Sequence, residues 1–215
     1  IVEAVDGRRV DRYVSEEIFE PLGMRSCRMG IPLEEQAELA DRIAPVVWKG
    51  HAVPRLADGG LQMVEYRVDA VHNEPWHIAK VEPAAGVRGP ARELGRFYES
   101  LVGFGTPVLE QRTVEVMIAA HRVGMPDRTY LGATHPWGLG VEVGSKIPGP
   151  AGRRAFGHGG MASSRGLADP DCGLVLAVIT NGLPDPLAHE GRMKAIVDAT
   201  YLALGDEVAL LRRSA

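Results

Sequence analysis

The segment 156–166 constrains the fold most, because it reads as a β-strand with no bulky side chain at its centre. Its sequence is Phe-Gly-His-Gly-Gly-Met-Ala-Ser-Ser-Arg-Gly. Residues 169–173, Asp-Pro-Asp-Cys-Gly, follow, and an apolar run then ends at Thr180 and Asn181. Proline presets the turn dihedral and glycine can close the turn, so the pattern predicts a β-hairpin. Glycine inside a strand costs stability and often marks the close approach of a ligand or another backbone. The hairpin therefore predicts a strand that lines a site.

Hydrophobic periodicity predicts the elements around this hairpin. Helices are predicted over residues 9–20, 90–102, 113–120 and 186–204, and strands over 138–144, 154–158, 163–168 and 174–180. Residues from about 32 to 83 lack a sustained period, and we expect a long, mostly irregular cover with a few short elements. This order predicts an α+β fold in which an antiparallel β-sheet is flanked by helices.

Composition excludes several classes of protein. The net charge is −4 and no run of lysine or arginine forms a phosphate-binding stripe, so nucleic acid is not an expected partner. Cys27 and Cys172 lie far apart and form no Cys-x-x-Cys pair, which predicts two unpaired, partly buried thiols. No signal peptide or transmembrane segment is visible. The chain begins at Ile1 within what reads as the tail of a helix, so we expect part of a longer protein whose compartment stays undecided.

The common catalytic and nucleotide-binding motifs do not occur. No serine is followed three residues later by lysine, and there is neither a Gly-x-Ser-x-Gly elbow nor a phosphate-binding loop. The glycines in 138–144 do not have dinucleotide-binding spacing, and no cofactor is expected. His72, Glu74 and His77 lack the His-Glu-x-x-His spacing, and Pro75 breaks any helix there. We therefore expect structural or surface histidines and no metal.

The glycine-rich strand supplies the candidate site residues. His158 is either a hydrogen-bonded strand residue or a cleft residue that donates a hydrogen bond to a substrate or a catalytic hydroxyl. Gly159 and Gly160 would keep the wall low enough for an acyl group, and the backbone N–H of Met161 would form one arm of an oxyanion hole. Trp137 is either a buried aromatic residue at the sheet edge or a wall of the substrate pocket.

Four segments in the same order resemble one family. They are Tyr13–Met24 with its Pro-Leu-Gly-Met ending, Gly89–Leu101, Trp137–Gly140, and Phe156–Asn181 with its His-Gly-Gly and Thr-Asn sequences. Together they resemble the serine β-lactamase and penicillin-binding-protein superfamily, especially class C β-lactamases and their esterase relatives. The resemblance does not extend to a variable cover segment at about 30–85. It implies that residues 1–215 are the C-terminal portion of one β-lactamase-like domain, incomplete at its N-terminal side.

In that superfamily a serine attacks an ester or amide carbonyl, while a lysine and a tyrosine manage the proton and an acyl-enzyme forms. The Ser-x-x-Lys and Tyr-x-Asn motifs that carry these groups are absent from this chain. The resemblance implies that His158, Gly159 and Gly160 occupy the third motif, usually Lys-Thr-Gly in β-lactamases, with Met161 as the oxyanion donor. The lysine helps to hold a substrate carboxylate. Histidine, with an ordinary pKa of about 6.5, does this poorly at neutral pH, which favours esterase, peptidase or acyltransferase relatives.

Three hypotheses follow. The first is a serine hydrolase of the β-lactamase-like fold that acts on a small-molecule ester or amide, completed by the missing N-terminal part of the same domain. The second is an acyltransferase of the same fold, which passes the acyl group to an acceptor other than water. The third is a truncated, non-catalytic protein that uses its sheet for binding or assembly. The oligomeric state stays open.

Overall fold

The computed structural model describes residues 1–48, 52–53, 62–63, 71–127, 134–144, 147, 149–160 and 164–214. It confirms the α+β class, because helices flank an antiparallel sheet. The chain divides into two compact units, which are described separately. The first consists of Ile1–Pro90, Gly160–Ser164 and Ile179–Glu190, and the second of Ala91–Gly159, Arg165–Val178 and Gly191–Ala215.

Short elements make up the first unit, as the lack of a sustained period at 32–83 predicts for the described part of that range. The helical segments are α1 (Val2–Asp6), α2 (Val10–Val14), the π-helical η1 (Ser15–Phe19), α3 (Leu33–Glu38), the 3-10 turns η2 (Ala40–Arg42) and η3 (Val71–Asn73), and α4 (Pro75–Ile78). The strands are β1 (Arg28–Met29), β2 (Val47–Trp48), β3 (Ala52–Val53), β4 (Gln62–Met63), β5 (Val87–Arg88) and β10 (Gly182–Leu183).

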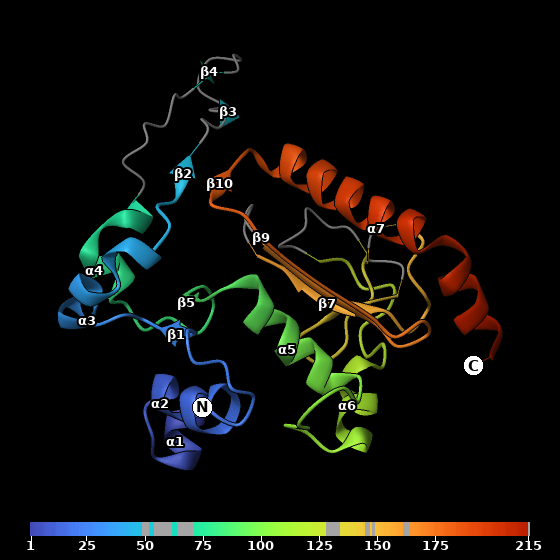
Figure 1. Ribbon diagram of the computed structural model, residues 1–215, viewed down its shortest axis with the longest axis horizontal. Helices are drawn as coiled ribbons and strands as arrows, with labels where there is room; N and C mark the ends of the chain where they lie inside the picture. Colours follow the sequence, from blue (N-terminus) through green and yellow to red (C-terminus); the bar gives the residue numbers. More distant parts are fainter. Residues whose placement is uncertain are drawn as a thin grey trace. The chain divides into compact units, whose positions relative to one another are not determined.

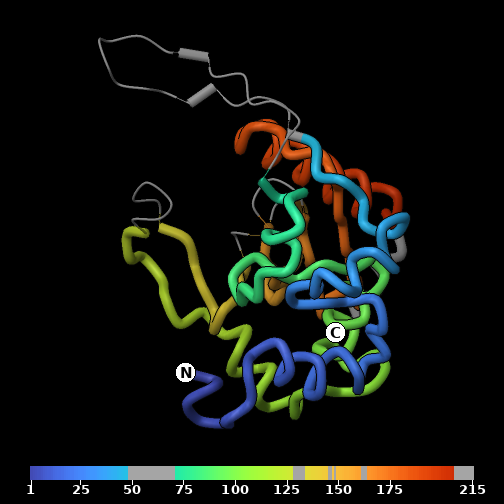
Figure 2. The backbone as a smooth tube through the Cα atoms, turned by 90° about the vertical axis from the view of Figure 1, so that its left-hand side faces the viewer, coloured from blue at the N-terminus to red at the C-terminus, as the bar shows by residue number. Residues whose placement is uncertain are grey.

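These strands form three two-stranded ladders. β1 pairs with β5 and β3 with β4, both antiparallel, whereas β10 pairs in parallel with β2. In Figures 1 and 2 the blue β1 segment and the green β5 segment accordingly run side by side. The helix predicted over 9–20 is confirmed as α2 followed by η1, and its last turns are π-helical.

The second unit contains the predicted hairpin. Its four-stranded sheet has the order β6 (Glu142–Val143), β7 (Phe156–Gly159), β8 (Ser164–Asp169) and β9 (Leu174–Ile179), and its helices are α5 (Ala91–Leu101), α6 (Gln111–Ile118) and α7 (Pro186–Ser214). β7 pairs antiparallel with both β6 and β8. A turn joins β8 to β9, and Gly173 adopts φ +63° there, in agreement with its predicted role.

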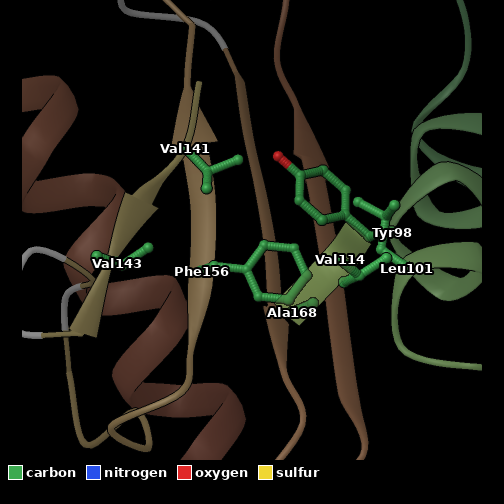
Figure 3. Packing of buried hydrophobic residues seen from close by; sticks show 7 residues of the cluster. All are labelled: Tyr98, Leu101, Val114, Val141, Val143, Phe156 and Ala168. Atoms are coloured by element: carbon green, nitrogen blue, oxygen red, sulfur yellow. The ribbon is translucent and has the colours of Figure 1, made fainter. Parts of the chain in front are cut away.

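The sheet of this unit is packed on both faces, because successive strand side chains point to opposite sides. On one face Phe156 and Ala168 pack with Tyr98 and Leu101 of α5 and with Val114 of α6 (Figure 3). On the other face a separate cluster joins the sheet to α7; its members include Ala155, Leu167, Val197 and Tyr201. Figure 1 shows α7 and α5 on opposite sides of the strands.

One predicted strand was too long. The strand predicted over 138–144 shrinks to β6, because Gly140 has φ +78° and the N–H of Leu139 donates to the carbonyl of Met117 instead of to a sheet partner. Periodicity does not encode such a tertiary contact. The helix predicted over 186–204 is confirmed, because α7 is broken at Gly205, which has φ 34° and ψ −107°, and a further helical stretch continues to Ser214.

Cys27 and Cys172 are both buried, more completely than the partial burial expected from the sequence. No helix in the described part of the chain combines the length and the apolarity needed to cross a membrane.

The carboxylate of Asp169, which is 0% exposed, joins three parts of the second unit. Its oxygens accept hydrogen bonds from the backbone N–H of Gly152 at 2.8 Å, the N–H of Asp171 at 3.1 Å and the hydroxyl of Tyr201 at 2.6 Å. A Cβ atom at Gly152 would lie 2.6 Å from this carboxylate. The buried carboxylate of Asp169 thus connects three segments of the second unit: the end of β8, the loop before β7 and helix α7.

Tyr201→Phe should lower the free energy of unfolding by about 1–3 kcal/mol, because it removes one donor from a buried carboxylate and leaves the ring in place. Urea unfolding of the native protein measures this. Tyr13→Phe is the control. The ring of Tyr13 contacts the Arg8 guanidinium at 4.9 Å, and we expect a change within about 0.5 kcal/mol. Equal effects of the two substitutions would contradict the assigned importance of the Asp169 centre.

Candidate functional site

His158 is an exposed residue of β7. Its Nδ1 atom lies 2.7 Å from the carbonyl oxygen of Gly159. Because a carbonyl oxygen only accepts hydrogen bonds, Nδ1 must be the donor. In the sheet register His158 stands opposite Gly166 of β8, and the ring of Tyr98 fills the space that a side chain at Gly166 would occupy. The sequence-predicted histidine is therefore presented at the surface of the second unit, with one ring nitrogen already engaged.

Trp137 flanks this histidine. Its ring centroid lies 5.7 Å from that of His158, with the planes inclined by 47°. The residue is half-buried, and bridges to Arg122 and Glu142 hold its backbone next to β6. The placement combines the two interpretations of the sequence, since Trp137 is an aromatic residue at the sheet edge and also adjoins the candidate site residue.

Tyr98 of α5 packs against the sheet at the level of His158, on the face to which the histidine side chain also points. Its ring occupies the space above Gly166, where a Cβ atom would lie 2.0 Å from the ring. The backbone N–H of His158 donates a hydrogen bond to the phenol oxygen. In Figure 3 the hydroxyl of Tyr98 points away from Leu101 and Val114. Burial raises the pKa of Tyr98 to about 12, so the group is a neutral phenol at physiological pH.

The glycines of the strand have different neighbours. A Cβ atom at Gly157 would lie 2.2 Å from the carbonyl oxygen of Gly166, so two backbones approach closely there. At Gly159 a Cβ atom would lie 3.3 Å from the guanidinium of Arg165. Gly160 belongs to the first unit, and its N–H donates to the carbonyl of Ser164 at 2.9 Å. Met161, the expected oxyanion donor, lies outside the described residues.

A buried ion pair lies on the other face of the sheet. Arg165 Nη1 donates to Glu142 Oε2 at 3.0 Å, and the two side chains are 13% and 3% exposed. Arg165 pairs with Gly159 in the register, and strand alternation places it on the face of Leu167, opposite to His158. Its positive charge is neutralised by Glu142 and does not project on the side of the histidine.

The histidines considered as metal ligands lie in the first unit. The rings of His72 and His77 are 4.9 Å apart in an edge-to-face contact, and Trp76 adjoins His77. Burial, reinforced by His77 and Arg88, lowers the pKa of His72. The described residues contain no group of three or more His, Cys, Asp or Glu arranged to hold a metal ion.

Hydrophobic periodicity does not distinguish Tyr98 as a site residue, because Tyr98 fits the buried stripe of α5 like any other apolar position. The contact with Gly166 depends on two segments nearly seventy residues apart in sequence. A single sequence carries no signal that joins them.

Gly166→Ala should lower stability by about 1–3 kcal/mol, because the new methyl group would overlap the ring of Tyr98. Denaturant unfolding measures the loss. Gly191→Ala is the matched control, since a Cβ atom at this α7 position meets no atom within 4 Å, and we expect no loss or a gain of up to about 1 kcal/mol. In a Tyr98→Ala background the cost of Gly166→Ala should fall; an undiminished cost would contradict the assigned overlap.

The buried phenol also predicts a pH dependence of stability. Between about pH 10 and pH 12 the unfolded tyrosine ionises while the folded one keeps its proton, so its contribution to stability is complete below about pH 10 and is lost as the pH rises to about 12. The difference in unfolding free energy between the native protein and Tyr98→Phe should decrease over this range. A constant difference would show that the hydroxyl titrates as in the unfolded chain.

Comparison with known proteins places the chain in a family. Residues 1–200 match the family described as Beta-lactamase. The chain is 28% identical over 204 residues to the esterase/beta-lactamase LipL of Mycobacterium tuberculosis (strain ATCC 25618 / H37Rv), with 87% of this chain and 46% of that protein covered.

Two solved structures are similar in fold. A penicillin-binding-protein homologue from Caulobacter crescentus has a TM-score of 0.68 at 26% identity, covering 94% of this chain and 54% of the other. EstA from Arthrobacter nitroguajacolicus Rue61a has a TM-score of 0.67 at 19% identity, covering 95% and 57%. The chain thus spans about half the length of these proteins. Because the family match extends over most of its residues, the chain belongs to the beta-lactamase family.

Proposed function

We propose that this chain is part of a serine hydrolase that acts on a small-molecule ester or amide through an acyl-enzyme. The observation that carries the proposal is the glycine-rich strand β7, which presents His158 beside Trp137 in a chain of the beta-lactamase family. The name of the esterase/beta-lactamase relative supports the same reaction class. The missing parts are the nucleophile and its proton-handling groups, since this chain has no Ser-x-x-Lys or Tyr-x-Asn motif.

Within this proposal the strand forms one wall of the acyl site. Gly159 and Gly160 have no side chain to obstruct an acyl group, and the N–H of Met161 supplies one oxyanion donor. Such a donor stabilises the charge that develops on the carbonyl oxygen in the transition state, an effect of a few kcal/mol. Trp137 provides an apolar flank for the acyl group.

The charged side chains around β7 favour an ester over a substrate whose own carboxylate needs a cationic partner on the protein. The third-motif lysine of β-lactamases is replaced by His158. The nearest guanidinium on the paired strand, that of Arg165, projects on the opposite face and is bound to Glu142. A substrate carboxylate beside His158 would thus lack a permanent positive charge from these strands. An esterase-type or peptidase-type substrate is accordingly preferred.

A fluorophosphonate probe tests the proposal. The natural protein that contains this chain should gain one probe adduct by intact-mass analysis, and peptide mapping should place it on a serine of a Ser-x-x-Lys motif outside residues 1–215. A polypeptide of residues 1–215 alone, 23.2 kDa, is the matched control and should gain none. Absence of an adduct on the natural protein, together with no hydrolysis of short-chain nitrophenyl esters, would refute the hydrolase.

The assay with nitrophenyl esters also separates hydrolysis from acyl transfer. With a simple alcohol added as acceptor, a hydrolase releases mainly the free acid, whereas an acyltransferase of the same fold releases mainly the new ester. Mass spectrometry of the products measures the ratio. Labelling without release of either product would favour a protein that binds and retains the acyl group.

A further inference from the structure

We infer that His158 presents Nε2 as a hydrogen-bond acceptor, so that this wall of the site recognises a hydroxyl group on the acyl part of the substrate. The inference rests on the proposed function and adds a substrate class, hydroxyacyl esters. It also reverses the direction of the hydrogen bond expected from sequence, in which His158 was the donor.

The contact between His158 and Gly159 determines the tautomer of the imidazole ring. Nδ1 of His158 contacts the carbonyl oxygen of Gly159 at 2.7 Å, a distance typical of a hydrogen bond. The carbonyl has no proton to give, so Nδ1 carries the hydrogen. A neutral imidazole has one N–H, and therefore Nε2 bears a lone pair. A ring in this state accepts a hydrogen bond from a hydroxyl group and gives none to a carboxylate.

The imidazole of His158 is accessible to a substrate. His158 is exposed on β7, and its Nδ1 is engaged by the carbonyl of Gly159, so Nε2 is the ring nitrogen left for a substrate. Trp137 stands on one side at a centroid distance of 5.7 Å, which leaves an apolar flank next to a polar acceptor. That combination suits an acyl chain that carries a hydroxyl group, because the chain can lie against the indole while its hydroxyl reaches Nε2.

Contacts of its backbone and side chain hold His158 in place. Tyr98 accepts the backbone N–H of His158, and Gly166 provides the space for the tyrosine ring. The backbone N–H of the histidine is thus bound by Tyr98, while its side chain is bound to the carbonyl of Gly159. Tyr98 is a positioning residue in this arrangement, since it contacts His158 and not the substrate.

The tautomer is measured first, without any activity assay. The native protein is labelled with ¹⁵N-histidine, and long-range ¹H–¹⁵N spectra at neutral pH distinguish a protonated ring nitrogen from one with a lone pair. His158→Asn identifies the ring signals by their disappearance among those of the seven histidines. We expect a protonated Nδ1 and a lone pair on Nε2. A protonated Nε2 in the neutral ring would overturn the inference.

Two buried tyrosines provide the matched pair for the positioning step. Tyr98→Phe should shift the backbone amide signal of His158 and mix the ring tautomers. Tyr201→Phe removes an equally buried hydroxyl, which is bound to Asp169, and should leave both signals unchanged. Identical spectra for Tyr98→Phe and the native protein would remove Tyr98 from the assignment.

Substrate recognition is then tested with two esters that differ only in a hydroxyl or a methoxy group on the acyl chain. The native protein should prefer the hydroxyl ester by about 3- to 10-fold in kcat/KM, the effect of one neutral hydrogen bond. His158→Asn keeps an amide donor for Gly159 but has no group at Nε2, and His158→Phe has neither; both should lose the preference. An unchanged preference in both variants would refute recognition by His158.

The two proposals fail separately. A native protein that hydrolyses neither ester and takes no fluorophosphonate adduct refutes the proposed function, and recognition of hydroxyacyl esters with it. A native protein that hydrolyses both esters equally retains the proposed function and refutes the hydroxyl recognition.

Discussion

The second unit depends on the buried carboxylate of Asp169. A fully buried charge is costly unless every lone pair is used, and here two backbone N–H groups and a phenol hydroxyl bind it. These donors come from the loop before β7, the turn after β8 and helix α7, so the charge determines how loop, turn and helix meet. An asparagine at 169 would direct an amide N–H₂ group toward donors, which is why a nearly isosteric substitution would not preserve the centre.

On the other face of the sheet the organising contact is apolar. Tyr98 and Phe156 lie with their rings 6.1 Å apart in the cluster that joins α5 and α6 to the sheet. The ring of Tyr98 reaches the strand only because Gly166 has no side chain, and the phenol oxygen then meets the backbone of His158. The contact between Tyr98 and the sheet thus contributes both to the packing of the core and to the placement of the candidate site. A change in the core at Tyr98 should therefore alter the histidine as well as stability.

Family membership and local geometry support different parts of the functional argument. The beta-lactamase family and the esterase-named relative support the reaction class, whereas the chain spans only about half of the relatives it matches. The local geometry concerns the wall that the substrate meets. There the exposed His158 and the half-buried Trp137 lie together, while the guanidinium of Arg165 is on the opposite face and bound to Glu142; the proposed preference for a neutral, hydroxyl-bearing ester rests on this arrangement.

The sequence by itself determined the order of helices and strands, the hairpin with Gly173 in its turn, and the His-Gly-Gly strand, because these depend on periodicity and on residues with special backbone dihedrals. It also carried the resemblance that the family match confirms. Only the tertiary structure decided that Gly157 and Gly166 permit contacts within the protein, that Tyr98 packs against the strand at His158, and that Arg165 lies on the opposite face. These features join residues distant in sequence, and they depend on shape and hydrogen-bond direction, for which hydrophobic periodicity contains no information.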